Sequence, residues 1–315
     1  MEVFKFLKEN IQKDNRAMLL LVVQSKGSSP GRQGFKMAVA MNNDICGSIG
    51  GGIMEYRLVE EAKVLLRKKS FEPFLKKQIH KGEVTNGSGM ICSGEQVILF
   101  KILDRSDLQT IDEVLTHKQG ILKIKPAAFE FHQDAIENRK FVFTAEKEGW
   151  TYAEKISKKN QLFIIGAGHV GLATSEIFSK LDFEITLIDD RKNLNTLASN
   201  NYSDKVIITD YHEIDAYIPE NENTFIAIMT NGYQTDKIAL EKVIDKKVGY
   251  IGVLGSKTKL KAMYTVLEKQ GVSKNQLKNI HAPIGLSIQS QTPAEIAISI
   301  AAEIIAVKNK TELKY

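Results

Sequence analysis

Cysteine is scarce in this chain. Only two cysteines, Cys46 and Cys92, occur among its 315 residues. Two cysteines do not make the disulfide framework of a secreted protein, and their separation lacks the close spacing of a zinc site. The sequence therefore predicts free thiols in a reducing compartment.

Long apolar runs are also missing. No stretch approaches the roughly 20 apolar residues that a transmembrane helix needs. The first residues, MEVFKFLKENIQKDNR, lack the apolar centre and the cleavage site of a signal peptide. We therefore expect a cytoplasmic protein with no stable membrane insertion.

The chain has no strong excess of one charge. Its net charge of +5 comes from 43 Lys and Arg against 38 Asp and Glu, and the cations are scattered in short runs. Such runs are typical of solvated faces, and no helix-turn-helix or interleaved aromatic pattern accompanies them. A nucleic-acid partner is therefore not expected.

What the chain does have is a division into two halves. Its length favours two domains. In the first half, apolar runs of strand length outnumber helical patterns, which predicts an α+β domain. In the second half, strands and helices alternate, which is typical of a doubly wound parallel sheet of the Rossmann type. We expect an α/β chain with domains over residues 1–155 and 156–315, divided within the polar segment 146–160.

A glycine-rich turn follows the first strand of the second half. Gly166, Gly168 and Gly171 form GAGHVG directly after the strand QLFII and before a helix, and Asp189 ends the next strand. In a dinucleotide fingerprint these glycines allow a tight turn, close approach of a pyrophosphate and close packing of the helix. Asp189 is the candidate for a ribose hydroxyl and Arg191 for the adenine or a 2′-phosphate, so NAD and NADP both remain open.

Other polar residues follow strands of the second half. His169, inside the fingerprint, is expected to be a structural or phosphate-proximal group. Thr230, Asn231 and Asp236, in TNGYQTD, either line the crevice at the sheet edge or form only a loop and a helix cap. Ser256, in GVLGSK, either belongs to a second anion site or is a helix N-cap.

The first half has its own glycine-rich turn. In GSIGGGIMEY, Gly50, Gly51 and Gly52 precede a helix that carries Glu55. Successive glycine amides can form a nest for an anion such as phosphate, although the Lys and Ser/Thr of a nucleotide-hydrolysing loop are missing. Glu55 either binds a ligand or is a carboxylate that favours the helix dipole.

Two more features of the first half are candidates for the same pocket. The segment GSSPGR ends in Arg32, a counter-charge for an anion, although a plain hairpin loop is the alternative. Cys92 lies among small residues that would let a ligand approach its thiol, although a lone cysteine is often inert.

Taken together, these motifs resemble the XdhC/CoxI family. The resemblance rests on GSSPGRQGFKMAV, GSIGGGIMEYRLVEEA and MICSGEQVILF in the first half, and on LFIIGAGHVGLATSEIF, YIGVLGSKTKL and HAPIGLSIQSQTPAEIA in the second. That family comprises accessory proteins for xanthine dehydrogenase and related molybdenum hydroxylases. The resemblance implies that the chain binds the molybdenum cofactor (molybdopterin, a phosphorylated pterin dithiolene), protects it during sulfuration and delivers it to the apo-enzyme.

The resemblance also implies sites and partners. It assigns Gly50, Gly51, Gly52, Glu55 and Cys92 to the cofactor or its sulfuration, with the Cys92 thiol as the metal ligand. The Rossmann half would hold NAD(P), another nucleotide or a nucleotide form of the cofactor. The implied partners are a molybdenum hydroxylase client and a sulfurtransferase of the cysteine desulfurase type, and a homodimer is one expected assembly. The implied role is binding and hand-off, with no catalytic residue.

Some positions depart from the family pattern. Asn231 and Tyr233 stand where many relatives carry histidines, and Ser287 stands where an aspartate is common. These departures weigh against a metal in the second crevice. Two other functions stay open, an NAD(P)-dependent oxidoreductase of unknown substrate and a nucleotide-sensing regulatory module.

Overall fold

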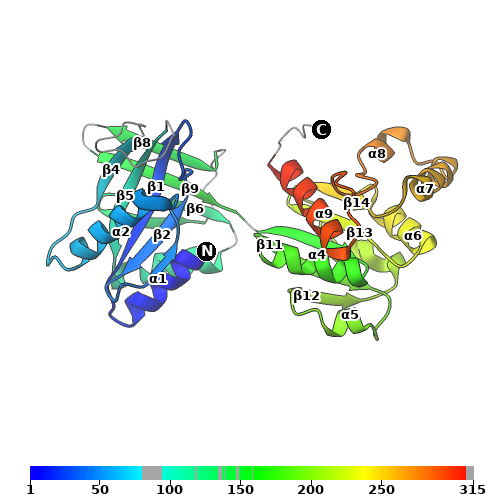
Figure 1. The fold of residues 1–315 in the computed structure, drawn as a ribbon, viewed down its shortest axis with the longest axis horizontal. Helices are drawn as coiled ribbons and strands as arrows, with labels where there is room; N and C mark the ends of the chain where they lie inside the picture. The colour runs from blue at the N-terminus through cyan, green and yellow to red at the C-terminus, as the bar shows by residue number, and fades with distance from the viewer. Residues whose placement is uncertain are drawn as a thin grey trace. The chain divides into compact units, whose positions relative to one another are not determined.

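The computed structural model describes residues 1–79, 94–117, 119–133, 137, 139–146, 149–157 and 159–309. The chain divides into two compact units, Met1–Lys158 and Lys159–Tyr315, which are called the N-terminal unit and the C-terminal unit below (Figure 1). The first is an α+β unit and the second is Rossmann-like, so the predicted fold class is confirmed.

Two antiparallel sheets form the N-terminal unit. Its strands are β1 Ala17–Lys26, β2 Lys36–Ala40, β3 Ile45–Gly47, β4 Phe74–Ile79, β5 Glu95–Leu103, β6 Gly120–Lys125, β7 Ala128–His132, β8 Phe141–Glu146 and β9 Gly149–Ile156. The sheet orders are β3-β2-β1-β5-β4 and β7-β6-β9-β8. The helices are α1 Glu2–Gln12, α2 Gly52–Leu66 and α3 Leu108–Thr116, and a short 3₁₀ helix, η1, covers Arg105–Asp107.

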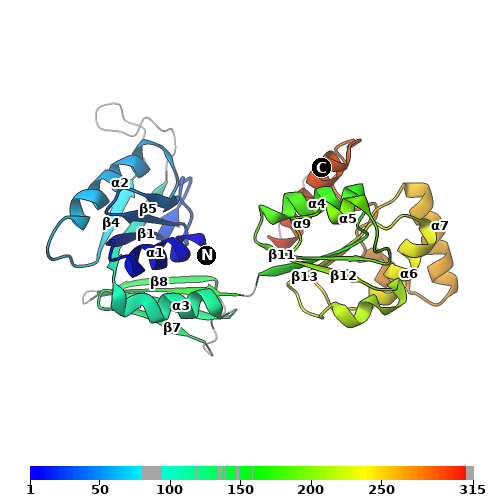
Figure 2. The same cartoon turned by 90° about the horizontal axis from the view of Figure 1, so that it is seen from below.

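Both faces of the first sheet are covered. Helix α2 packs on one face, and α1, α3 and the second sheet lie on the other (Figure 2). Alternate residues of β1 enter the two cores, Met18 and Leu20 facing α2 while Leu19 and Leu21 face α1. Burial on both faces explains why this strand is a continuous apolar run.

The C-terminal unit is a doubly wound sheet. Its strands are β10 Asn160–Ile165, β11 Phe183–Asp189, β12 Lys205–Ile208, β13 Thr224–Ile228 and β14 Tyr250–Val253. They pair in parallel in the order β12-β11-β10-β13-β14, and His281 adds a parallel bridge to Gly252. The helices are α4 His169–Ser179, α5 Asn195–Ala198, the 3₁₀ helix η2 Tyr211–Tyr217, α6 Tyr233–Val243, α7 Lys257–Lys269, α8 Lys274–Lys278 and α9 Pro293–Lys308.

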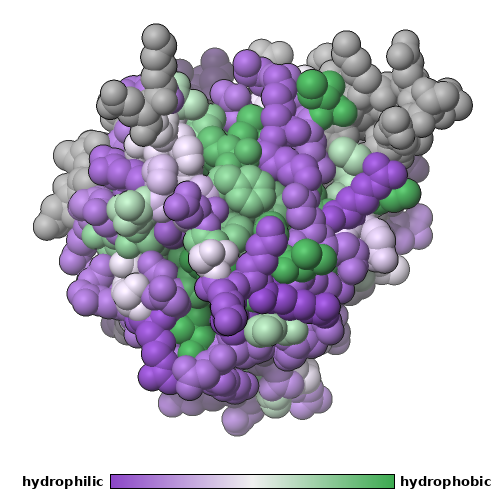
Figure 3. Space-filling model, turned by 90° about the vertical axis from the view of Figure 1, so that its left-hand side faces the viewer, coloured by the Kyte–Doolittle hydropathy of each residue, from purple (hydrophilic) through white to green (hydrophobic). Residues whose placement is uncertain are grey.

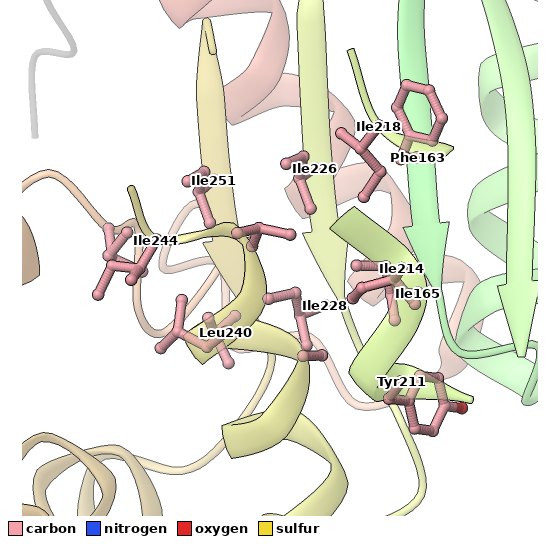
Figure 4. Packing of buried hydrophobic residues seen from close by; sticks show 14 of the residues in the cluster. Phe163, Ile165, Tyr211, Ile214, Ile218, Ile226, Ile228, Leu240, Ile244 and Ile251 are labelled. Carbon is pink, nitrogen blue, oxygen red and sulfur yellow. The ribbon is translucent and has the colours of Figure 1, made fainter. Parts of the chain in front are cut away.

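Helices cover the two faces of this sheet in two groups. Helices α4 and α9 pack together on one face, whereas η2, α6 and α7 cover the other. Figure 4 shows part of the second core, in which isoleucines of β10, β13 and β14 meet side chains of η2 and α6. The strand order reverses between β10 and β13, so the ligand crevice of such a sheet is expected at the carboxyl ends of these strands.

The sequence patterns missed several elements. Strands β6 and β7 and helix α8 were not predicted, and the polar segment expected to contain the domain boundary holds β9 for most of its length. These strands place polar and charged residues between their apolar ones, as GILKIK does in β6. Such short alternation resembles a polar loop until a second sheet is known to cover one face.

Candidate functional site

Glycine-bearing loops of the N-terminal unit pack directly against one another. A Cβ atom on Gly31, in the loop between β1 and β2, would lie 2.1 Å from the carbonyl oxygen of Ile49. A Cβ atom on Gly94, which leads into β5, would lie 2.5 Å from the carbonyl carbon of Ser28. The loop between β1 and β2, the turn before α2 and the start of β5 therefore form one cluster, and only residues without side chains allow these contacts.

Buried polar side chains of β4 and β5 bind this loop cluster through hydrogen bonds. The Ser29 hydroxyl donates to Gln96 Oε1 at 2.9 Å, and the Gly31 amide donates to the same oxygen at 3.2 Å. Gln96 Nε2 in turn donates to Gln78 Oε1 at 2.9 Å, which joins β4 to β5. Each of these buried polar groups thus has a partner, and the hydrogen bonds join the loop between β1 and β2 to strands β4 and β5.

The turn before α2 already contains an anion. Glu55 Oε2 accepts hydrogen bonds from the amides of Ile49 at 2.8 Å and Gly51 at 3.0 Å, and from the Ser48 hydroxyl at 2.7 Å. Burial acts to raise the pKa of Glu55, but these hydrogen bonds outweigh it and hold the pKa below its usual value. The Glu55 carboxylate is therefore the group that occupies the glycine nest.

The backbone of this turn explains its three glycines. Gly50, Gly51 and Gly52 have φ values of +135°, +73° and +70°, a region that other residues rarely adopt. A Cβ atom on Gly50 would also lie 2.6 Å from the amide nitrogen of Gly31. The glycine triplet is thus required by the chain itself, and the amides of Ile49 and Gly51 are not available to a phosphate while Glu55 is in place.

The two cysteines differ in what the structure describes. Cys92, the predicted cofactor and metal ligand, lies outside the described residues. Cys46, in β3, is partly buried against the N-terminal core, and burial followed by the charge of Glu2 raises the pKa of its thiol. In the parts of the chain that are described, no group of three or more His, Cys, Asp or Glu side chains is arranged to hold a metal ion.

In the C-terminal unit, two fingerprint glycines are needed by the fold. Gly166 has a φ of +120°, and a Cβ atom on it would lie 2.3 Å from the carbonyl oxygen of Met229 at the end of β13. A Cβ atom on Gly171 would lie 2.1 Å from the Gly166 carbonyl oxygen. The first glycine therefore allows the turn at the point of strand reversal, and the third allows α4 to pack close to it.

Gly168, the middle glycine, has no such requirement. Its φ of −73° and ψ of −169° are open to any residue, and, apart from its own neighbours in the sequence, no atom of the described chain lies within 4 Å of where its Cβ would be. It is the N-cap of α4, and the exposed His169 is the first residue of that helix. Space is thus left open at a helix N-terminus, where backbone amides and the helix dipole favour an anion.

The carboxylate of Asp189 is buried and fully bonded. Its Oδ2 accepts from the Ala167 amide at 2.7 Å and from Arg191 Nη2 at 2.9 Å. Its Oδ1 accepts from Arg191 Nε at 2.9 Å and from the Arg191 amide at 3.0 Å. Burial acts to raise the pKa of Asp189, but the hydrogen bonds from Arg191 and Ala167 lower it overall, so the ionised carboxylate ties the glycine turn to the end of β11.

A second buried carboxylate lies after β13. Asp236 Oδ1 accepts from the amide and the hydroxyl of Thr230 at 2.8 and 2.6 Å, and Lys259 Nζ of α7 bonds to Oδ2. Asn231 is exposed beside them, and its side chain accepts a long bond of 3.4 Å from the Thr235 hydroxyl. Asp236, in the first turn of α6, thus connects the loop after β13 to helix α7.

Ser256 acts as a helix cap. Its hydroxyl accepts from the Lys259 amide at 3.2 Å, which makes it the N-cap of α7. This is the simpler of the two roles predicted for it.

Sequence reasoning missed two groups that the structure brings forward. Asp190 follows Asp189 at the carboxyl end of β11, and only the DDR triplet hinted that a second acid stands there. Glu303 of α9 is buried and accepts from the Tyr250 hydroxyl and, at 2.8 Å, from the Gly285 amide, while His281 Nδ1 lies 3.3 Å away. No spacing in the sequence links these distant residues, so their network could not be predicted.

These features define a two-unit α/β protein whose second unit is Rossmann-like. A family model of the XdhC Rossmann domain matches residues 162–304, and a model of the XdhC and CoxI family matches residues 11–75. The chain therefore belongs to the XdhC and CoxI family, as its motifs indicated.

Curated relatives are longer than this chain. "Uncharacterized protein YqeB" of Escherichia coli (strain K12) is 26% identical over 289 residues, which cover 91% of this chain and 43% of that protein. A probable xanthine dehydrogenase component of Bacillus subtilis (strain 168) is 23% identical over 159 residues, or 50% of this chain and 46% of that protein. This chain thus spans less than half the length of the curated relatives it matches.

A solved structure shares the fold. The crystal structure described as a xanthine dehydrogenase from Bacillus halodurans superimposes with a TM-score of 0.81 and 22% identity, covering 99% of this chain and 97% of that one. At this identity the likeness shows the fold alone.

Proposed function

We propose that this protein is a cytoplasmic accessory factor that binds the molybdenum cofactor, assists its sulfuration and helps to insert it into an enzyme of the xanthine dehydrogenase type. Family membership, matched in both units, is the observation that carries the proposal. The name of the B. subtilis relative supports a xanthine dehydrogenase client. A sulfurtransferase is the partner that sulfuration would require.

The C-terminal unit is proposed to bind a nucleotide at the turn before α4. The fit is supported by Gly168, whose backbone does not need glycine and whose Cβ position is free of described atoms. A pyrophosphate that approaches the N-terminus of α4 would make use of this space. His169 lies next to it and is exposed, as a group near the phosphates would be.

The N-terminal unit is proposed to hold the pterin at its loop cluster. The proposed position of the phosphate is the outer side of the turn before α2, not the glycine nest that the sequence predicted. A phosphate does not fit into the glycine nest, because Glu55 takes its amides. The outer side of the turn fits better, since no described atom other than those of its neighbours in the sequence lies within 4 Å of a Cβ on Gly51. Arg32, exposed in the neighbouring loop, is the cation that we assign to the phosphate there.

The client is proposed to dock on the N-terminal unit. Ile53, Tyr56 and Val64 of α2 have 49%, 63% and 60% of their surface exposed. On the face drawn in Figure 3, apolar side chains gather in a band among polar ones. Exposed apolar surface of this kind is typical of sites that contact another protein.

Pterin retention by the full chain tests this function. Molybdopterin is released from a denatured molybdoenzyme under anaerobic reducing conditions and mixed with the protein. The pterin that elutes with the protein on size exclusion is then measured by its fluorescence after oxidation. The wild type should retain about one pterin per chain, and Arg32→Ala should lose most of it.

A matched control separates charge from site. Arg67→Ala removes an exposed arginine at the other end of α2 and should retain the pterin like the wild type. A wild-type protein that elutes without pterin would contradict the function. Equal retention by Arg32→Ala and the wild type would contradict the assigned site.

A further inference from the structure

We propose that the nucleotide site of the C-terminal unit selects a ribose without a 2′-phosphate, and that Asp190 rather than Asp189 accepts its hydroxyls. The ligand class is therefore a dinucleotide or a nucleoside diphosphate with free ribose hydroxyls. The inference rests on the proposed binding of a nucleotide by this unit.

Asp189 has no acceptor position left for a ribose. An ionised carboxylate offers about four lone-pair positions. All four are used by the Ala167 amide and by three N–H groups of Arg191, at 2.7 to 3.0 Å. The side chain is also fully buried, with 0% of its surface exposed. Its role is to fix the glycine turn, not to meet the ligand.

The same contacts engage the charge of Arg191. Two of its guanidinium nitrogens point at the two oxygens of Asp189 in a bidentate pair, the geometry in which an arginine holds a carboxylate most firmly. Its hydrogen bond to Asp189 keeps the pKa of Arg191 above its usual value. A 2′-phosphate at the remaining N–H groups of Arg191 would therefore meet a guanidinium whose charge Asp189 already balances.

Asp190 has the opposite surroundings. It comes directly after the last residue of β11, so it lies at the carboxyl edge of the sheet, one strand away from the glycine turn of β10. Its side chain is 40% exposed, and its Oδ1 lies 3.6 Å from Arg191 Nε, beyond hydrogen-bond distance. No side-chain hydrogen bond joins Asp190 to the rest of the described chain, so its oxygens are available to ribose hydroxyls.

A 2′-phosphate at this position would meet a carboxylate. Like charges brought together at a binding site disfavour the wrong ligand. Lys192, two residues further on, is exposed and is the competing candidate, because it could attract a phosphate. Lys192 lies three residues beyond the last residue of β11, whereas Asp190 directly follows that residue. Asp190 is therefore the group that a ribose at the strand end would meet first.

Two titrations of the full-length chain test the inference, with NADH and NADPH as probes and nicotinamide fluorescence as the readout. The wild type should bind NADH at least about tenfold more tightly than NADPH. Asp190→Asn should weaken NADH binding and reduce that ratio about tenfold. Asp182→Asn is the matched control, because this acid, 76% exposed, precedes β11 at the opposite end of the strand; it should leave both affinities unchanged.

The outcomes separate this inference from the function that it rests on. Equal or tighter binding of NADPH, or an unchanged ratio in Asp190→Asn, overturns the selection of the ribose. If Lys192→Ala loses NADPH binding and Asp190→Asn does not, Lys192 is the residue that faces the 2′-position of the ribose. That result would also overturn the inference. Failure of both probes to bind overturns the nucleotide site together with the inference, while the pterin measurement still decides the accessory function.

Discussion

The two glycine turns of this protein look alike in sequence but differ in what requires their glycines. In the turn before α2, Gly50, Gly51 and Gly52 all have positive φ values, and the chain could not make the turn without them. In the turn before α4, Gly166 and Gly171 are needed for close packing, whereas Gly168 has ordinary backbone angles and open space beside it.

The comparison of the two turns shows which kind of glycine indicates a ligand site. Each turn is completed by a carboxylate of the chain itself, Glu55 in one and Asp189 in the other. Glycines that such a turn needs are explained by folding, so their presence in the sequence does not by itself indicate a ligand. A glycine that neither the backbone angles nor the packing of the chain requires, such as Gly168, is the one that indicates a ligand.

The largest effect is expected where folding requires the glycine. Gly50→Ala and Gly166→Ala each place a Cβ atom against backbone atoms, at 2.6 and 2.3 Å, in a region of φ that alanine rarely adopts. Each should lower the free energy of unfolding by about 3 kcal/mol, measured by urea denaturation. Gly149→Ala, whose Cβ would come no closer than 4.0 Å to Pro126, is the control and should change little. If the two variants lose as little free energy of unfolding as the control, the turns can accommodate a side chain and do not require glycine.

Asp189→Asn should have the next largest effect. The amide cannot accept all four hydrogen bonds and leaves the guanidinium of Arg191 without its partner charge. We expect the free energy of unfolding to fall by about 2 kcal/mol at pH 7. Asp190→Asn, one residue along, should cost less than about 0.5 kcal/mol because its side chain is exposed. Equal costs for the two variants would contradict the division of roles between these acids.

Glu55→Gln is expected to cost less, about 1 kcal/mol at neutral pH, because a neutral amide oxygen accepts more weakly than a carboxylate. The pKa of Glu55 is lowered on folding, so its contribution is complete above its unfolded pKa of 4.5 and is lost as the pH falls through its folded pKa. The difference between wild type and variant should therefore shrink below about pH 4.5. Urea denaturation from pH 7 to pH 3 measures it, with Glu60→Gln on the same helix as the control. A difference that does not depend on pH would show that Glu55 is not held as the ionised anion.

Sequence patterns predicted most of the C-terminal unit but less of the N-terminal one. Four of the five parallel strands, β10, β11, β13 and β14, are largely buried and read as plain apolar runs, so they could be recognised one by one. The edge strand β12 is the exception, because its first two residues are exposed. Strands β6 and β9 place polar residues between their apolar ones, and the core that they join includes side chains of α1 and β1, far away in the chain. A strand with only one apolar face becomes recognisable only when the layer that packs on that face is known.

The sites were predictable as positions but not as contacts. The residue types showed that Glu55 and Asp189 stand beside glycine turns. They could not show that both carboxylates point back at their own turns, because side-chain direction depends on packing that distant residues supply. For the same reason, the neighbours Asp189 and Asp190 could not be told apart, although one is buried and the other is exposed.

The most direct test of the comparison is nucleotide binding by Gly168→Ala, followed together with its stability. Because the backbone angles suit alanine and the added methyl group meets no described atom, the free energy of unfolding should change by less than about 0.5 kcal/mol. The affinity for NADH should fall at least about tenfold, because the methyl group fills the space assigned to the pyrophosphate. Unchanged affinity at unchanged stability would contradict the claim that this glycine is kept for a ligand.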